Sequence, residues 1–196
     1  MIVKNNKVII ENALNKNDLE YIQSIHGGLD MPWSYNDGVA STNDGNFQFV
    51  VPVWTTLHFN RTAFDAASSI LNIIRPEFLL KIKTNLRTKT DTIQQSIMHN
   101  DSNIPGSLTA IFYLNTCDGY TIFNDGDKIY SVENTLIIFP GRLLHCGTTC
   151  TNENRRLVIN INYMPNPEND IWKMLMTDTD IQYKNYWNNR PNFACL

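Results

Sequence analysis

Three residues in the second half of the chain have side chains that bind transition metals: His99, Asp101 and His145. His99 and Asp101 are two residues apart, and residues at that spacing point to the same side of an extended segment, so both could hold one ion. His145 follows a predicted strand and a Pro140-Gly141 turn, which could bring it to the same ion from a facing strand. Taken alone, the His-x-Asp triplet is weak, because a turn residue that caps a strand explains His99 as well.

A basic residue further along the chain strengthens the metal hypothesis. Arg156 lies 11 residues after His145, at the start of a predicted strand. Along that strand Val158, Asn160 and Asn162 share its face, whereas the residues between them are apolar and fill the core side. Arginine matches a carboxylate through two parallel hydrogen bonds. An open metal site with a cation for a chelating carboxylate is the arrangement of non-haem iron(II) oxygenases. Arg155 is expected on the other face, as a surface or rim charge.

The first part of the chain is expected to supply helices that support such a site. Val8-Ile9-Ile10 is a short strand candidate. Asn15 begins a helix, with an acid three residues later and apolar residues at helical spacing until Gly27-Gly28. A second helix is predicted from Arg61 to Arg75, where Pro76 closes the pattern.

From Phe78 onward short strands replace helices. They are predicted at Leu79–Leu86, Ser107–Leu114, Tyr120–Phe123, Lys128–Val132, Thr135–Phe139 and Leu157–Tyr163. Asn124-Asp125-Gly126-Asp127 between two of them is a strong hairpin signal. Helices followed by many close-set strands indicate an α+β protein with an antiparallel sandwich or small barrel. The tail after Asn166 is expected to pack back on the body, because it carries Trp172, Tyr183, Tyr186, Trp187 and Phe193.

Bulk properties narrow the classes of function. At 196 residues the chain fits one domain, and no stretch approaches the ~18 apolar residues of a membrane span. The net charge of -3 disfavours tight non-specific nucleic-acid binding. The N-terminus does not read as a signal peptide, so a cytoplasmic location is expected. The four cysteines are expected to be free thiols: Cys117, Cys146, Cys150 and Cys195.

Longer motifs carry a resemblance to a known family. They are His99-Asn100-Asp101, Ala110-Ile111-Phe112-Tyr113-Leu114-Asn115, Asp118-Gly119-Tyr120-Thr121-Ile122-Phe123, Asn134-Thr135-Leu136-Ile137-Ile138-Phe139, His145 and the stretch from Arg156 to Tyr163. This part of the chain resembles the core of the iron(II)- and 2-oxoglutarate-dependent oxygenases, in the prolyl-4-hydroxylase-like branch. It is most similar to small oxygenases encoded by tailed bacteriophages, as are Met31-Pro32-Trp33-Ser34-Tyr35 and Lys81-Ile82-Lys83-Thr84-Asn85-Leu86.

The resemblance implies a fold and its boundaries. The expected fold class is α+β, with a double-stranded β-helix (jelly-roll, cupin-like) core at about residues 78–164. Residues 1–77 would form an N-terminal helical support and residues 165–196 a C-terminal tail, all within one oxygenase domain over 1–196. A phage enzyme would act in the host cytoplasm.

The resemblance also implies roles for single residues. His99, Asp101 and His145 would bind iron(II), and Arg156 would hold the distal carboxylate of the cosubstrate 2-oxoglutarate. Tyr113 would hydrogen-bond the same carboxylate, and Asn85 and Asn162 would contact 2-oxoglutarate, although a structural role is open for each of these three. Relatives often carry Tyr near position 87, where this chain has Arg87, a residue that could assist cosubstrate or face substrate.

The implied activity is hydroxylation of a C–H bond with O2, Fe(II) and 2-oxoglutarate, with ascorbate as an optional addition. Peptidyl proline is the favoured substrate, and a nucleobase or a small metabolite is the alternative. A protein, peptide or small molecule is a better expected partner than nucleic acid or a membrane, and monomer and homodimer are both open. Trp33, Tyr35, Trp54 and His58 could line a substrate entrance. Two other classes compete: a zinc hydrolase using the same three ligands, and a non-catalytic β-barrel binding module.

Overall fold

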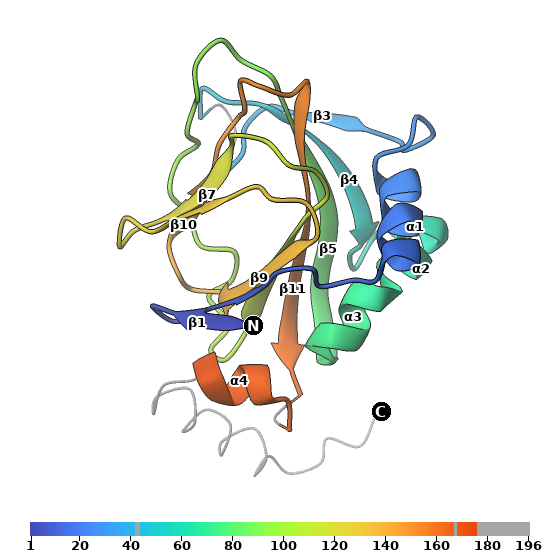
Figure 1. Ribbon diagram of the computed structural model, residues 1–196, viewed down its shortest axis with the longest axis vertical. Coiled ribbons are helices and arrows are strands. Elements are labelled where there is room, and N and C mark those ends of the chain that lie inside the picture. Colours follow the sequence, from blue (N-terminus) through green and yellow to red (C-terminus); the bar gives the residue numbers. More distant parts are fainter. Residues whose placement is uncertain (42–43, 167, 176–196) are drawn as a thin grey trace.

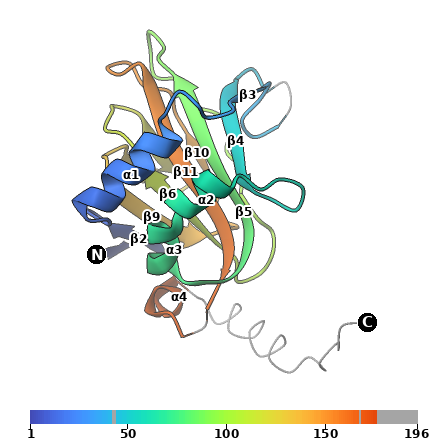
Figure 2. The same cartoon turned by 90° about the vertical axis from the view of Figure 1, so that its right-hand side faces the viewer.

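Two antiparallel sheets face each other in the computed structural model, which describes residues 1–41, 44–166 and 168–175. Three helices cover the outer face of the larger sheet, and a fourth lies below it (Figures 1 and 2). The helices are α1 (Lys16–His26), α2 (Arg61–Ala66), α3 (Ser68–Ile74) and α4 (Asp170–Leu175). The strands are β1 (Ile2–Lys4), β2 (Lys7–Ile10), β3 (Ser34–Asn36), β4 (Gln48–Trp54), β5 (Pro76–Thr88), β6 (Leu108–Tyr113), β7 (Tyr120–Phe123), β8 (Lys128–Tyr130), β9 (Thr135–Pro140), β10 (His145–Gly147) and β11 (Arg155–Pro165).

The strand order is that of a double-stranded β-helix with added strands. Within the described residues the large sheet runs β1-β2-β9-β6-β11-β5-β4-β3, and the small sheet runs β10-β7-β8. In the middle of the large sheet the neighbours β2 and β9, β9 and β6, β6 and β11, and β11 and β5 are far apart in sequence. By contrast, β7 and β8 form a hairpin whose turn places Gly126 at a φ of 85°, a conformation that glycine adopts without strain. The α+β fold class with a double-stranded β-helix core, predicted from the sequence, is therefore confirmed.

Alternation along β11 gives the large sheet two different faces. Leu157, Ile159 and Ile161 point to the helices, where they join a core that includes Ile22 of α1 and Ile74 of α3. The opposite face looks toward the small sheet. Its apolar part is a second, smaller core, made of Ile111, Tyr113, Phe123, Ile137, Phe139 and Val158. The remaining inner positions of β11 and β5 are polar or charged, so the space between the sheets is only partly filled by apolar side chains.

The register between β5 and β11 fixes which polar residues meet. Arg156 lies opposite Arg87, Val158 opposite Asn85, Asn160 opposite Lys83, and Asn162 opposite Lys81. Because side chains alternate along a strand, all of these residues belong to the inner face.

The N-terminal region differs from the expected helical support. Residues 1–77 contain α1 to α3, but also β1 to β4, and only the strand at Val8-Ile9-Ile10 was predicted. Strand β4 pairs with β5 in the middle of the site wall although it contains Pro52, which lies beside a register shift. Proline is tolerated at such irregular positions, but in a sequence it argues against a central strand, so β4 was not predicted.

The helix predicted over 61–75 is divided into α2 and α3. The break falls at Ala67, whose ψ of -4° ends the first helix just before Ser68 and Ser69. Serine hydroxyls compete for backbone hydrogen bonds and disfavour a helix interior. By contrast, α1 begins as predicted, with the Asn15 side chain accepting a hydrogen bond from the Asp18 amide.

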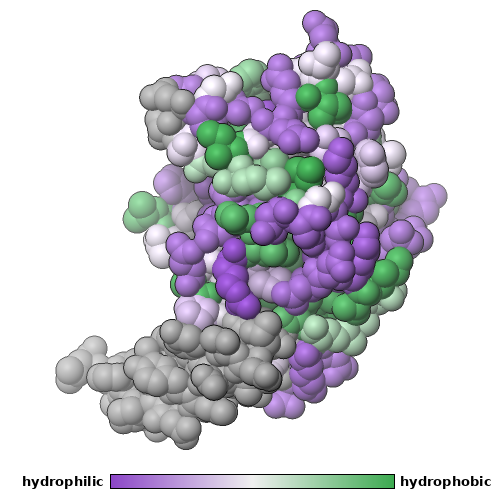
Figure 3. All heavy atoms as spheres, turned by 90° about the vertical axis from the view of Figure 1, so that its left-hand side faces the viewer, coloured by the Kyte–Doolittle hydropathy of each residue, from purple (hydrophilic) through white to green (hydrophobic). Residues whose placement is uncertain are grey.

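The tail is described only as far as α4, in which Trp172 is buried as expected. Tyr183, Tyr186, Trp187, Phe193 and Cys195 lie outside the described residues. No described helix has the length and hydropathy needed to cross a membrane. On the small-sheet side of the molecule, hydrophobic residues form scattered groups among hydrophilic ones (Figure 3).

Candidate metal centre

The structure brings His99, Asp101 and His145 together between the two sheets. One potential ligand atom from each residue lies within 4.8 Å of the others. The segment that carries His99 pairs with β10 through two backbone hydrogen bonds of 2.9 Å, from each histidine amide to the other histidine's carbonyl. The amide of Asp101 donates to the carbonyl of Gly141 at 3.1 Å. The backbone thus fixes all three positions, and the His-x-Asp triplet and the distant histidine form one cluster.

Both imidazoles present the same nitrogen to the centre of this cluster. His99 Nδ1 lies 3.1 Å from the Ile97 carbonyl, and His145 Nδ1 lies 2.9 Å from the Leu143 carbonyl. A carbonyl oxygen only accepts hydrogen bonds, so each Nδ1 must carry the proton and a neutral ring keeps a free lone pair on Nε2. A hydrogen bond that fixes the tautomer of a histidine in this way is the usual support of a metal ligand.

The carboxylate of Asp101 is held ionised. Asn160 donates from Nδ2 to Asp101 Oδ2 at 3.1 Å, and His145 Nε2 is 3.5 Å from the same oxygen. Burial alone would raise the pKa of Asp101, but His145, Asn160 and Lys81 together hold that pKa below its ordinary value. Burial lowers the pKa of His145, which favours the neutral imidazole. One carboxylate and two imidazoles form a donor set that fits a divalent transition metal.

A pocket of about 270 Å³ opens beside this cluster. Inner-face residues of β5 and β11 form one wall, and all three cluster residues line the pocket. Arg156 lies four residues along β11 from Asn160, which touches Asp101, and four residues of strand span roughly 13 Å. The metal cluster and the arginine therefore occupy different parts of one pocket.

Arg156 is a buried cation with neutral partners. Its side chain is only 4% exposed. Nε donates to Ser131 Oγ at 3.1 Å and Nη2 donates to Thr121 Oγ1 at 3.0 Å, and Arg156 makes no ion pair with any described carboxylate. A Cβ added at Gly119 would lie 2.7 Å from Arg156 Cδ, so the glycine makes room for the side chain. A buried charge is costly without a partner, which indicates an anionic ligand at this end of the pocket.

Arg87 lies next to Arg156 and is a second buried cation at this end of the pocket. It is 6% exposed, its Nη2 donates to Asn46 Oδ1 at 3.0 Å, and its Nη1 is buried with no hydrogen-bond partner among the described residues. Burial, and then the charge of Arg156, lower the pKa of Arg87. Two neighbouring guanidinium groups repel each other unless an anion lies between them.

The structure distinguishes the other residues singled out from the sequence. Asn85 lines the pocket, and its buried Oδ1 has no hydrogen-bond partner. Tyr113 is not among the lining residues, but it packs against two of them: its hydroxyl donates to Thr121 Oγ1 at 2.9 Å, and the guanidinium carbon of Arg156 lies 5.4 Å from the centre of its ring. Asn162 is also outside the lining and donates to Thr109 Oγ1 at 2.9 Å. Tyr113 and Asn162 are thus placed next to lining residues and not among them, and their expected contact with 2-oxoglutarate stays a prediction.

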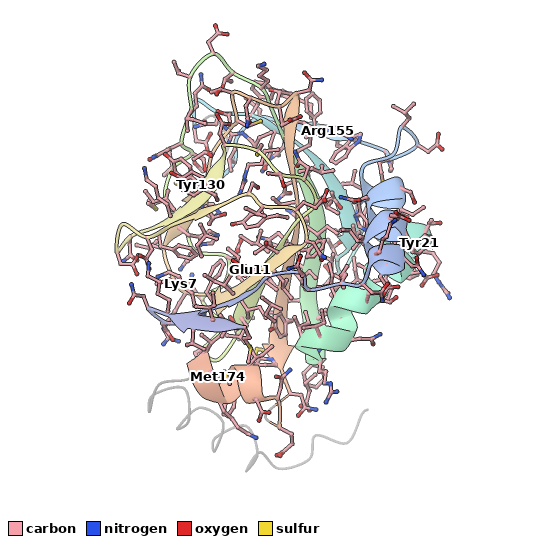
Figure 4. The ribbon with its side chains drawn as sticks, viewed as in Figure 1. Lys7, Glu11, Tyr21, Tyr130, Arg155 and Met174 are labelled. Carbon is pink, nitrogen blue, oxygen red and sulfur yellow. The ribbon has the colours of Figure 1, made fainter. Side chains whose placement is uncertain are left out.

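The aromatic residues expected at a substrate entrance do not line the pocket. Trp33 and Trp54 pack against the helix-side core. Tyr35 is 61% exposed and stacks on Phe47, and His58 is exposed. Arg155 donates to the Gly27 carbonyl at 2.9 Å, away from the pocket, near the upper end of β11 in Figure 4. Its placement confirms the register deduced from the alternation along the strand.

Several lining residues were not predicted as site residues. Asn160 was placed on the polar face, but its bond to Asp101 depends on a contact between segments 59 residues apart. Lys81 and Lys83 alternate with apolar residues along β5, a signal that is visible in the sequence but common on exposed strands. Gln48 reaches the pocket from β4, which was not predicted as a strand.

No protein-family description matches the sequence, and no curated protein resembles it. Solved structures do share its shape. An α-ketoglutarate-dependent epimerase of nogalamycin biosynthesis, SnoN, superposes with a TM-score of 0.63 at 14% identity, over 82% of this chain and 78% of that one. A prolyl hydroxylase from Trichoplax adhaerens, in complex with a peptide of hypoxia inducible factor, gives 0.61 at 17% identity, over 89% of both chains.

A third structure holds both a metal and the cosubstrate. HygX from Streptomyces hygroscopicus, with nickel and 2-oxoglutarate bound, gives a TM-score of 0.56 at 10% identity, over 83% of this chain and 84% of that one. At such identities the likeness concerns the fold and not the activity. The chain thus has the double-stranded β-helix fold that solved 2-oxoglutarate- and metal-binding proteins also have.

Proposed function

We propose that this protein is an iron(II)- and 2-oxoglutarate-dependent dioxygenase that hydroxylates a C–H bond. The observation that carries the proposal is the presence of two complementary elements in one pocket. One is the His99, Asp101 and His145 cluster, with both Nε2 lone pairs free. The other is Arg156, a buried guanidinium with no anionic partner among the described residues.

The residues present fit the cofactor set. His99, Asp101 and His145 would occupy one face of the iron, and Asn160 keeps the carboxylate oriented. Iron(II) and O2 would supply the oxidising chemistry that converts 2-oxoglutarate to succinate and carbon dioxide and hydroxylates the substrate.

Arg156 would bind the distal carboxylate of 2-oxoglutarate, while Thr121 and Ser131 hold the guanidinium in place. Arg87 Nη1 is free to donate to the same carboxylate. Ile111 and Val158 contribute apolar lining that limits the access of water.

The substrate proposal is less specific. Peptidyl proline is the class favoured by the sequence resemblance, and two neighbours in fold are described as prolyl hydroxylases. A nucleobase is disfavoured, because the described residues that line the pocket include no Phe, Tyr or Trp on which a base could stack. A peptide or a small molecule is therefore the proposed substrate.

A direct test combines turnover with metal content. Purified protein supplied with Fe(II), 2-oxoglutarate, O2 and ascorbate should form succinate, and His99→Ala, Asp101→Ala and His145→Ala should each lose iron binding and succinate formation. Protein that purifies with zinc and forms no succinate would support the zinc-hydrolase alternative. Protein that binds neither metal nor 2-oxoglutarate would support a non-catalytic binding module.

A further inference from the structure

The pocket carries more positive charge than the proposed cofactors use. Among the described residues its lining contains four cationic side chains, Lys81, Lys83, Arg87 and Arg156, and one carboxylate, that of Asp101. A divalent metal would add two positive charges and 2-oxoglutarate would remove two, so the surplus of cationic groups would persist. A surplus of this kind in a confined pocket attracts an anion.

The unused charge lies on two lysines. Lys81 and Lys83 are two residues apart on β5, and both belong to the inner face. Neither side chain makes a hydrogen bond or an ion pair with another described residue, although both lie close enough to Asp101 for their charges to interact with it. Burial, and then the charge of Lys81, lower the pKa of Lys83. These ammonium groups therefore lack a counter-charge within the described part of the chain, except for the carboxylate that is proposed to bind metal.

The lysines are also separated from the arginines. Lys83 lies four residues along β5 from Arg87, or roughly 13 Å of strand. In the paired strand β11, Asn160 lies opposite Lys83 and donates a hydrogen bond to Asp101, whereas Arg156 lies opposite Arg87. The lysines are thus at the metal end of the wall, and the arginines are at the other end. A 2-oxoglutarate molecule that reached from the metal to Arg156 would extend away from Lys81 and Lys83.

We propose that Lys81 and Lys83 form a subsite that binds an anionic group, a carboxylate or a phosphate, of the primary substrate. This inference rests on the proposed function and makes it narrower. The substrate is then an acidic small molecule, or a peptide with an acidic or phosphorylated group near the hydroxylated carbon. The two ammonium groups bind the anion beside the metal and so position the C–H bond that reacts.

A purely structural role would give a different outcome. If the two lysines served only to keep Asp101 ionised, their removal would weaken metal binding and would not affect an added anion. Binding measurements can separate these roles without any turnover.

The experiment uses wild-type protein loaded with Mn(II) and 2-oxoglutarate in the absence of oxygen. Inorganic phosphate, acetate and uncharged acetamide are titrated into it by calorimetry. We expect one phosphate or one acetate to bind without displacing 2-oxoglutarate, and acetamide not to bind. A preference for phosphate would indicate a phosphorylated substrate, and a preference for acetate a carboxylate.

Variants locate the anion. Lys81→Met/Lys83→Met should weaken anion binding at least tenfold and change the affinities for manganese and 2-oxoglutarate much less than that. Lys81→Arg/Lys83→Arg should retain anion binding, because it retains the charge. Lys89→Met is the matched control, since Lys89 follows β5 directly but is exposed and outside the pocket.

Three results would overturn the subsite: loaded protein that binds neither anion, equal binding by the Met double variant, or an anion that displaces 2-oxoglutarate. Weakened manganese binding with unchanged anion binding would also overturn it and would assign the lysines to Asp101. Wild-type protein that fails to load metal or 2-oxoglutarate would instead refute the proposed function, and the subsite with it.

Discussion

Replacing Arg156 with methionine should weaken the binding of 2-oxoglutarate and leave the metal site intact. Methionine is unbranched and adaptable, so it occupies much of the space of the arginine stem without its charge. The matched control is Arg155→Met, because Arg155 is adjacent in sequence but donates to the Gly27 carbonyl on the other face of β11.

The expected magnitude follows from the contacts of Arg156. Ser131 and Thr121 hold Nε and Nη2, and the 4% exposure keeps water away from the charge. A hydrogen bond to a charged group contributes about 1.5–3 kcal/mol, which corresponds to a factor of roughly 10–150 in affinity. Arg87 Nη1 is free to take over part of the carboxylate binding, so the dissociation constant of 2-oxoglutarate should rise by roughly 10- to 100-fold.

The assay is a calorimetric titration of 2-oxoglutarate into Mn(II)-loaded protein without oxygen, with manganese affinity measured in parallel. Circular dichroism checks that each variant is folded. The reasoning is refuted if Arg155→Met raises the dissociation constant and Arg156→Met does not, because the inner and outer faces of β11 would then be exchanged. It is also refuted if Arg156→Met weakens manganese binding as much as it weakens 2-oxoglutarate binding.

Two further predictions concern residues around the site and in the core. Asn160→Ala removes the donor that holds Asp101 Oδ2 and should lower metal affinity by roughly 10- to 100-fold in a manganese titration. The control Asn162→Ala loses only a hydrogen bond to Thr109 and should leave metal affinity unchanged. Equal effects of the two substitutions would contradict an orienting role for Asn160. Burial lowers the pKa of His26 to about 4 from 6.5, so the folded protein binds this proton less tightly than the unfolded chain does. The stability that comes from keeping His26 neutral is fully present above pH 6.5, and the free energy of unfolding falls by about 3 kcal/mol as the pH falls toward 4. Urea titrations should show a smaller fall for His26→Gln. An unchanged pH dependence in this variant would contradict the prediction.

The part of the site that lies on one strand could be predicted from the sequence. Alternation from Arg156 to Asn162 assigned the arginine to the polar face and Leu157, Ile159 and Ile161 to the core, and the structure confirms both assignments. Asn15 and the Asn124–Asp127 turn were equally local signals, since a cap and a tight hairpin depend on a few consecutive residues.

Contacts that depend on long-range packing could not be deduced from a single strand. Tyr113 and Asn162 point toward the inner side of the large sheet, and only the structure shows that their polar groups donate to Thr121 and Thr109 on other strands. The strand β4 was missed because its half-buried sequence contains Pro52, and its role becomes visible only when it pairs with β5. Whether an inward residue reaches a cavity or packs behind its wall depends on neighbours from other strands.

The sequence by itself determined the types of chemical group and their order along the chain: two histidines, an aspartate and an arginine on short strands whose alternation separates a polar face from an apolar one. The tertiary structure decided which groups share one pocket. It joined His99 to His145 through backbone pairing, turned Asn160 toward Asp101, and placed Arg87, Lys81 and Lys83 in the pocket without an ion pair to any residue in the described part of the chain. The reason is physical: alternation is a property of consecutive residues, whereas a hydrogen bond or an unpaired charge depends on strands that meet only after the sheets have formed.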